Sequence, residues 1–232
     1  MSKENVLFIV IGLLAGFMIG FFFANSVNQG AMIPTVAGGA AQPAAGLPSG
    51  HPAVPNAGGG PVPEVQAAID KAKQNPTDFD AQMKAAELYY QIQRFDGAAE
   101  FLKKASELQP DDYDVIVNLG NAYFEAGKYE DAEKSYIKAL TKKADDLGVR
   151  TDLGLTFVFR DPPNHDRAIQ EFRRVLDADE NHIQALQNLT VAYTRKPDKA
   201  NAVATLARLE QVDPSNNAIP KLREEIEKMG AI

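Results

Sequence analysis

Residue types recur along the C-terminal part of this chain at an interval of 34 residues. An aromatic residue returns at Tyr89, Tyr123, Phe157 and Tyr193, and an alanine returns at Ala98, Ala132, Ala168 and Ala202. In each series two of the three intervals are 34 residues long and the remaining one is 36 residues long. A fixed period of about 20 to 50 residues indicates an array of similar units, each of which buries its apolar face against its neighbours.

The two extra residues of the longer interval have one location. Both series lengthen across the segment 160–166, which reads RDPPNHD. Adjacent prolines cannot continue a helix, because proline lacks the backbone N–H and its ring clashes with the preceding turn. We therefore predict a turn here that is two residues longer than the corresponding turns of the other units.

The repeated residues resemble the signature of the tetratricopeptide repeat (TPR) family, in which a Leu-Gly-x-x-Tyr segment precedes a small residue beyond a turn. The best match has Leu119, Gly120, Tyr123 and Ala132. The resemblance implies an all-α fold, a right-handed superhelix of about four antiparallel helix hairpins, with Leu119 and Tyr123 between two helices. The predicted repeats are 79–112, 113–146, 147–182 and 183–216. The third of these contains the two-residue insertion.

A further helix is expected at each end of the array. The segment 64–76 has an apolar face and ends at a proline, so it predicts a leading helix, and 217–229 predicts an amphipathic closing helix. Aspartates stand where the first helices of the repeats should begin, as helix N-caps do. The candidates are Asp78, Asp111 or Asp112, and Asp145 or Asp146.

The N-terminal region predicts a membrane anchor. After a short tail, 1–5, the segment 6–24 has nineteen residues without a charge, enough to cross a hydrocarbon core of roughly 30 Å as a helix. A cleaved signal peptide is the competing interpretation, because Ala24-Asn25-Ser26 resembles a cleavage site. Lys3 in the tail favours a cytoplasmic N-terminus. By resemblance to membrane-anchored bacterial repeat proteins, we expect the repeats in the periplasm and the anchor in the inner membrane.

Two further features concern the anchor and the segment that connects it to the repeats. Gly12, Gly16 and Gly20 form overlapping G-x-x-x-G spacings, which favour pairing of two membrane helices and hence a homodimer, although glycine is also simply frequent in such helices. The segment 25–63 is rich in Ala, Gly and Pro and has no Asp, Glu, Lys or Arg. We predict a disordered linker, because this composition buries little apolar surface.

The resemblance also implies a concave groove lined by the first helix of each repeat. The residues at its groove positions are Met83, Glu87, Tyr90, Val117, Asn118, Asn121, Phe124, Thr151, Asp152, Leu155, Val158, Gln187, Asn188, Val191 and Arg195. Amides among apolar side chains suit an extended peptide backbone with apolar side chains. The alternative for Phe124 and Val158 is packing between neighbouring repeats.

One known mode of binding in this family is predicted to be absent. Some of its members hold a C-terminal carboxylate with lysine, asparagine and arginine side chains, because a carboxylate needs fixed donors. The matching positions hold Met83, Glu87, Asn118, Gly148 and Asp152, so only the asparagine remains. We expect no recognition of acidic C-terminal tails.

Several functional classes are disfavoured by what the sequence lacks. A net charge of −7 without a basic run argues against a nucleic-acid partner. There is no cysteine, and His51, His165 and His182 are widely separated, so we expect no metal or cofactor. His165 or His182 beside an aspartate would be needed for catalysis, but no nucleophile motif or phosphate loop accompanies them. We expect a protein that is not an enzyme.

The leading hypothesis is a membrane-tethered scaffold or chaperone-like module that binds protein or peptide clients. By resemblance, such modules attend envelope assembly, secretion or cytochrome c maturation. The alternative is a purely architectural tether that associates with itself and has no separate client.

Overall fold

The computed structural model describes residues 63–229, and every regular element in that range is an α-helix. In chain order they are α2 (Pro63–Gln74), α3 (Phe79–Gln91), α4 (Phe95–Leu108), α5 (Tyr113–Glu125), α6 (Tyr129–Lys142), α7 (Leu147–Phe159), α8 (His165–Ala178), α9 (Ile183–Arg195), α10 (Lys199–Val212) and α11 (Ile219–Lys228). The prediction of an all-α fold is confirmed for this range.

The predictions for the N-terminal region lie almost entirely outside the described residues. They are the tail 1–5, the transmembrane helix 6–24 with Gly12, Gly16 and Gly20, and the linker except for its last residue, Pro63, which is the first residue of α2. Proline suits that position, because the N–H it lacks would have no partner inside the helix. Among the helices of residues 63–229, none has the length and apolar character needed to cross a bilayer.

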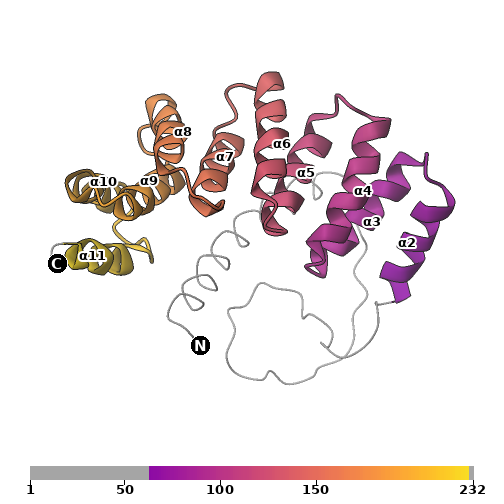
Figure 1. Cartoon of the computed structure of the whole chain (residues 1–232), viewed down its shortest axis with the longest axis horizontal. Helices are drawn as coiled ribbons and strands as arrows, with labels where there is room; N and C mark the ends of the chain where they lie inside the picture. Colours follow the sequence, from indigo (N-terminus) through magenta and orange to yellow (C-terminus); the bar gives the residue numbers. More distant parts are fainter. Residues whose placement is uncertain (1–62, 230–232) are drawn as a thin grey trace, which may run out of the picture. The chain divides into compact units, whose positions relative to one another are not determined.

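The helices form antiparallel hairpins that stack in chain order, as the row from α2 to α11 in Figure 1 shows. The hairpins are α3 with α4, α5 with α6, α7 with α8, and α9 with α10, and the second helix of each also packs on the first helix of the next. Helix α2 packs on α3 at one end, and α11 packs on α10 and α9 at the other. Each unit is therefore stabilised mainly by its immediate neighbours.

Side-chain caps set where the first helix of each hairpin begins. Asp78, Asp112 and Asp146 each accept a hydrogen bond from the backbone N–H three residues later, at 2.9 to 3.0 Å. In the fourth hairpin His182 does the same through Nδ1, at 3.2 Å. Of the two candidate aspartates before α5 and α7, the second is the cap in both cases. Each cap satisfies an N–H that has no partner within its helix.

Within the second and third hairpins, an aromatic ring of the second helix lies against a glycine of the first. A Cβ atom on Gly120 would lie 2.6 Å from Cε1 of Tyr136, and one on Gly154 would lie 2.4 Å from Cε1 of Phe172. Both rings are fully buried. The glycines allow the two helix backbones to approach closely enough for these rings to fill the space between them.

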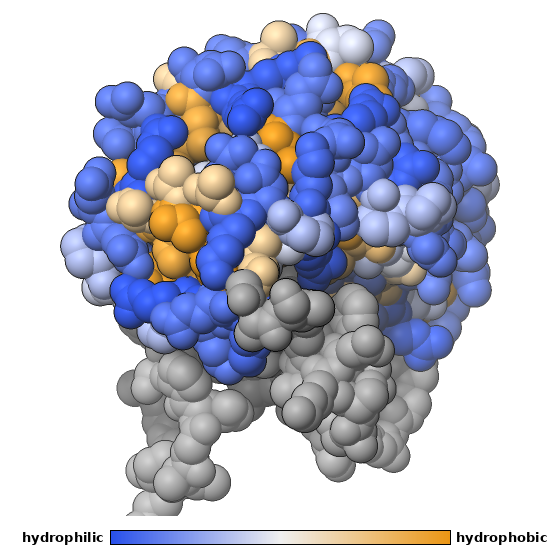
Figure 2. Space-filling view, turned by 60° about the vertical axis from the view of Figure 1, so that its left-hand side comes forward, coloured by the Kyte–Doolittle hydropathy of each residue, from blue (hydrophilic) through white to orange (hydrophobic). Residues whose placement is uncertain are grey.

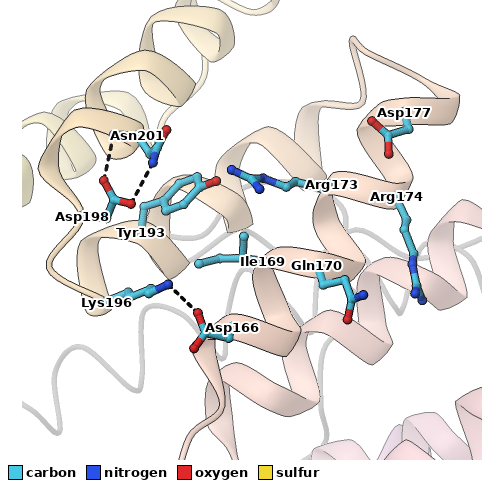
Figure 3. Close-up of a pocket in the computed structure, with 10 residues that line it drawn as sticks. All are labelled: Asp166, Ile169, Gln170, Arg173, Arg174, Asp177, Tyr193, Lys196, Asp198 and Asn201. Atoms are coloured by element: carbon cyan, nitrogen blue, oxygen red, sulfur yellow. Dashed lines mark hydrogen bonds and ion pairs between the residues drawn. The ribbon is translucent and has the colours of Figure 1, made fainter.

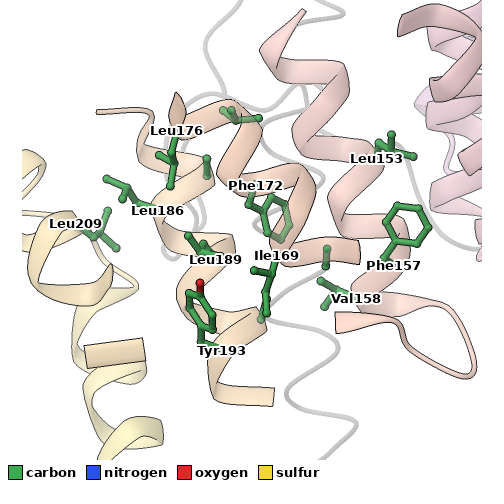
Figure 4. Packing of buried hydrophobic residues seen from close by; sticks show 14 of the residues in the cluster. Leu153, Phe157, Val158, Ile169, Phe172, Leu176, Leu186, Leu189, Tyr193 and Leu209 are labelled. Atoms are coloured by element: carbon green, nitrogen blue, oxygen red, sulfur yellow. The ribbon is translucent and has the colours of Figure 1, made fainter. Parts of the chain in front are cut away.

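The buried apolar residues form two clusters that meet in the second hairpin. One extends from α2 to α5 and the other from α5 to α11. Figure 4 shows part of the second, in which Phe157 of α7, Phe172 of α8 and Leu189 of α9 lie in successive layers. Tyr123 packs against both clusters. Leu119, expected with Tyr123 between two helices, also packs against the first cluster, and both residues are half-buried.

The α7–α8 connection is five residues long (160–164), whereas the other three hairpin connections are three residues long (92–94, 126–128 and 196–198). It is held to the preceding hairpin by Glu133 of α6. Arg160 and Arg167 donate to the two carboxylate oxygens of Glu133, at 3.2 and 3.1 Å. The longer turn thus reaches across to its neighbouring repeat.

The face of the described chain seen in Figure 2 is mostly hydrophilic. In the view of Figure 2, charged and polar residues cover most of the described surface and apolar residues form separate small patches. The large apolar side chains that are most exposed are Leu108, Ile137, Ile183 and Val203. They are scattered over α4, α6, α9 and α10 rather than gathered on one helix.

The glycine contact in the third hairpin can be tested by Gly154→Ala. We expect a loss of about 1–3 kcal/mol in the free energy of unfolding, because the new methyl group must displace the buried ring of Phe172. Urea titration followed by circular dichroism measures it. The control is Gly148→Ala at the exposed start of the same helix, where the nearest atom is Oδ1 of Asp146 at 3.3 Å and a change within about 0.5 kcal/mol is expected. Equal losses would show that the close approach at Gly154 is unimportant.

Candidate functional site on the first helices

The first helices of successive hairpins present side chains to one common surface, which we call the groove face. Tyr90 of α3, Glu125 of α5 and Asp152 of α7 belong to three different hairpins. Nevertheless the charges of Glu125 and Asp152 both raise the pKa of Tyr90, after the larger effect of its burial. Charges act strongly only at short range in a protein. Side chains from three hairpins are therefore close together on this face.

Most of the predicted groove residues are half-buried. They are Met83, Glu87, Tyr90, Val117, Asn118, Asn121, Asp152, Leu155, Gln187, Asn188, Val191 and Arg195. Three others, Phe124, Thr151 and Val158, are buried, with exposed fractions of 7, 5 and 2 %. These three therefore present little surface to a partner, and the alternative of packing holds for Phe124 and Val158, which belong to the core. The hydroxyl of Thr151 donates to the carbonyl of Leu147.

An aromatic cluster lies along one edge of the groove face. The rings of Phe124 and Tyr129 are 5.4 Å apart, and Phe159 of the next hairpin is 5.9 Å from Phe124 and 6.2 Å from Tyr129. The guanidinium of Arg195 lies 5.5 Å from the ring of Phe159. Offset and edge-to-face rings at such distances attract one another. The cluster therefore joins the second hairpin to the third and holds this edge in a fixed form.

The groove amides are not equivalent. Asn121 accepts a hydrogen bond of 2.9 Å from the hydroxyl of Tyr136, whose ring is fully buried. Asn121 thus has a structural role, because without it the phenol of Tyr136 would lose its acceptor. Asn118 and Asn188 are half-buried and make no hydrogen bond with any described residue. These two asparagines are therefore available to a partner, as is the half-buried Gln187 of α9, which also makes no hydrogen bond with a described residue.

The carboxylate of Glu87 is already paired within its own helix. Lys84 donates to one of its oxygens at 3.1 Å and Gln91 to the other at 3.0 Å. A partner would have to displace one of these side chains to reach it. Glu87 is therefore a weaker candidate for contact than its position on α3 indicates.

Glu125 and Asp152 have no such partners. Glu125 follows Phe124 at the end of α5, and its burial raises the pKa of the carboxyl to about 7. Asp152 has its pKa raised to about 7 by burial and by the charges of Asp146 and Glu125. No cation or hydrogen-bond donor of the described chain contacts either carboxyl. An acid without a counter-charge or donor holds its proton more tightly.

The histidines give no sign of a catalytic arrangement. His182 caps α9, and His165 is the first residue of α8. Burial lowers the pKa of both, and the charge of Arg195 lowers that of His165 further. Within residues 63–229 no three side chains of His, Cys, Asp or Glu are grouped as metal ligands.

A hollow of about 440 Å³ lies away from these residues, between α8 and the α9–α10 turn. Figure 3 shows Ile169 at its floor, with Arg173 and Tyr193 on either side. Some of its polar groups pair with one another. Lys196 pairs with Asp166 at 2.5 Å, and Asn201 donates to Asp198 at 2.7 Å. Gln170, Arg173 and Asp177 also line the hollow and form no hydrogen bond or ion pair with a described residue.

Comparison with known families agrees with this architecture. Family models described as tetratricopeptide repeat match residues 93–151 and residues 62–113. These matches coincide with the stacked helix hairpins of α2 to α7. Over residues 62–151 the chain is similar to the TPR family. No curated protein sequence matches the chain significantly.

Solved TPR structures share the fold of this chain. The MamA protein is 22% identical, with a TM-score of 0.58 over 65% of this chain and 81% of that one. YrrB, described as a TPR protein with an unusual peptide-binding site, is 18% identical, with a TM-score of 0.61 over 69% of this chain and 81% of that one. A TPR protein from Parabacteroides merdae is 18% identical, with a TM-score of 0.59 over 66% and 60%.

The sequence pattern pointed to Asp152 but missed Glu125. Both occupy groove positions of a TPR first helix, and the same position as Glu125 holds Phe159 in the third repeat and Arg195 in the fourth. Glu125 follows Tyr123 and Phe124 in the sequence, and this combination of an acid with two aromatic residues could have marked it as a candidate groove residue. What could not be read from the TPR pattern is that no basic residue of a neighbouring repeat reaches either carboxyl.

The raised pKa values of Glu125 and Asp152 predict how the stability of the helical array depends on pH. Each has a raised pKa in the folded state, so between about pH 4 and pH 7 the folded chain binds more protons than the unfolded chain and loses stability as the pH rises. We expect Glu125→Gln with Asp152→Asn to stabilise the chain by on the order of 2 kcal/mol at pH 8 and by little at pH 5. Urea titrations at both pH values measure this, and an equal effect at pH 5 and pH 8 would contradict it.

Proposed function

We propose that this chain is a protein–protein interaction module that binds an extended segment of a partner along the groove face. The observation that carries this is the pair Asn118 and Asn188, half-buried amides on the first helices of the second and fourth repeats that have no hydrogen-bond partner in the described chain. An amide supplies both a donor and an acceptor, which is what an extended peptide backbone requires.

The surroundings of the two amides support a peptide ligand. Val117, Leu155 and Val191 are half-buried on the same face, so apolar area lies beside the polar groups. A partner that covers both kinds of residue gains from burial of apolar surface and keeps its backbone hydrogen-bonded. The peptide-binding site described for YrrB, which shares the fold, is consistent with this proposal.

We further propose that the module is tethered to a membrane by the segment 6–24, with the repeats in the periplasm of a bacterium. The charge-free length of that segment supports the tether, and Lys3 on its N-terminal side supports the orientation. A tethered groove would gather clients or subunits at the membrane, in a process such as envelope assembly, secretion or cytochrome c maturation.

The groove is tested by Asn118→Ala with Asn188→Ala. We expect unchanged helicity and melting temperature, because neither amide has a partner inside the folded chain, and a loss of client binding of about 1–3 kcal/mol. The measurement is affinity purification from detergent-solubilised membranes with the full chain as bait. The matched control is Gln74→Ala with Gln211→Ala, two exposed amides on α2 and α10. Wild-type recovery of clients by the groove variant would reject the groove face, and recovery of the chain alone would favour a self-associating tether.

The tether is tested by fractionation. The full-length chain should sediment with membranes, whereas a chain beginning near Pro61 should be soluble and keep its helical circular dichroism spectrum. The reason is that the long charge-free apolar run lies in 6–24, outside the repeats. A full-length product that appears in the soluble fraction about 25 residues shorter, as a cleaved signal peptide would leave it, would show that the segment is not an anchor.

A further inference from the structure

Two carboxyl groups on the groove face lack the partners that comparable carboxyl groups in this chain have. Glu171, whose side chain is 4% exposed, pairs with Arg150 and Arg174 at 3.0 and 2.9 Å. Glu133, at 17%, pairs with Arg160 and Arg167. In contrast, no described residue forms an ion pair with Glu125 or Asp152.

The arrangement around Glu125 is incomplete. Its Oε1 atom is buried and has no hydrogen-bond partner in the described chain. A buried carboxyl oxygen without a donor costs free energy in either protonation state, and the cost is larger when the group is ionised. Most buried polar atoms in proteins are hydrogen-bonded. A buried oxygen on the groove face without a donor can therefore be satisfied by a donor from a bound partner.

The groups that face the two acids offer no positive charge. Asp152 is affected by Asp146 and by Glu125, and Tyr136 by Asp152, Tyr90 and Glu125. All of these groups are acids or phenols. The potential at the two acids is therefore negative. Arg195 lies against Phe159 at the edge of the aromatic cluster but forms no ion pair with either acid.

Aromatic rings lie beside the acids. Phe124 precedes Glu125 directly, and the charge of Glu125 raises the pKa of Tyr129, after the effect of burial. Tyr129 in turn packs on Phe159. A cation gains from a carboxylate and from the face of an aromatic ring together, because both present negative potential to it.

We propose that Glu125 and Asp152 receive a positively charged side chain, Lys or Arg, from the segment that binds along the groove face. This rests on the proposed function of that face. The ammonium or guanidinium supplies the donor that Oε1 of Glu125 lacks and the counter-charge that both acids lack, while the backbone of the segment is held by the amides Asn118 and Asn188. The face is thereby selective for basic segments over acidic ones.

The proposal explains a feature that would otherwise only destabilise the protein. Two unpaired carboxyls on one face repel one another and resist ionisation, yet a hydrophobic or amide residue would fit there without that cost. Residues that lower the stability of the free protein are found where a ligand compensates for them. The pair Glu125 and Asp152 fits that description, and Glu133 and Glu171, with their arginines, do not.

The test uses the purified full-length chain in detergent and a displayed library of random short peptides. We expect the selected peptides to share a Lys or Arg, and a selected peptide remade with norleucine or Glu at that position to bind at least about tenfold more weakly. Glu125→Gln with Asp152→Asn should remove most of this preference and leave the norleucine peptide unaffected. The control, Glu107→Gln with Asp161→Asn, removes two exposed acids that make no hydrogen bond or ion pair and should change nothing.

A second measurement separates charge recognition from a change in shape. The affinity for the Lys peptide should be about tenfold higher at pH 8 than at pH 6, because carboxyls with a pKa of about 7 are mostly ionised only at the higher pH. The norleucine peptide should show no such dependence. In the variant Glu125→Gln with Asp152→Asn, the affinity for the Lys peptide should no longer depend on pH.

The outcomes distinguish the two levels of the proposal. Peptides that need Asn118 and Asn188 but bind equally well with Lys, norleucine or Glu would overturn the acidic site and leave the groove face intact. Peptides whose binding is unaffected by Asn118, Asn188, Glu125 and Asp152, or a selection that returns none, would overturn both. A Lys preference that the control variant also abolishes would overturn the assignment to these two residues.

Discussion

The contact between an aromatic ring and a glycine inside each central hairpin determines much of this structure. The rings of Tyr136 and Phe172 occupy the space that a Cβ atom on Gly120 or Gly154 would need, so the two helices of a hairpin sit at a distance set by one flat side chain. This spacing also affects the contacts between hairpins, because the second helix of one hairpin is the surface on which the next hairpin packs. The phenol of Tyr136 extends the effect to the groove face, where it fixes the amide of Asn121.

Contacts between sequential helices account for most of the tertiary structure, and this gives each residue of the groove face a local environment. The aromatic cluster of Phe124, Tyr129 and Phe159 needs only two adjacent hairpins, and the longer α7–α8 turn is bound by Glu133 of the hairpin before it. In an array of this kind stability is approximately a sum over units and interfaces. A face composed of one helix per unit can therefore vary in its side chains while the stack behind it keeps its form.

The periodicity in the sequence predicted the helical class, the hairpins and the caps, because these depend on residue types at fixed spacing. Asp112 and Asp146 could be placed within one residue in this way. Periodicity left the burial of Phe124 and Val158 open and gave no sign of that of Thr151, because the depth of a groove position depends on the side chains of the next repeat. The engagement of Asn121 by Tyr136 depends on a hydroxyl that reaches across from another helix. Period alone carries no information about such contacts.

The same reasoning explains why the sequence does not reveal the acids of the groove face as a pair. Glu125 and Asp152 are 27 residues apart, which is not a repeat interval, and they occupy different positions of their helices. Stacking of the second and third repeats brings their charges within range of each other and of Tyr90. What marks them is the lack of an arginine of the kind that compensates Glu133 and Glu171. Under the proposal above, a carboxyl that the fold leaves without a counter-charge on the groove face pairs with a Lys or Arg of the bound segment.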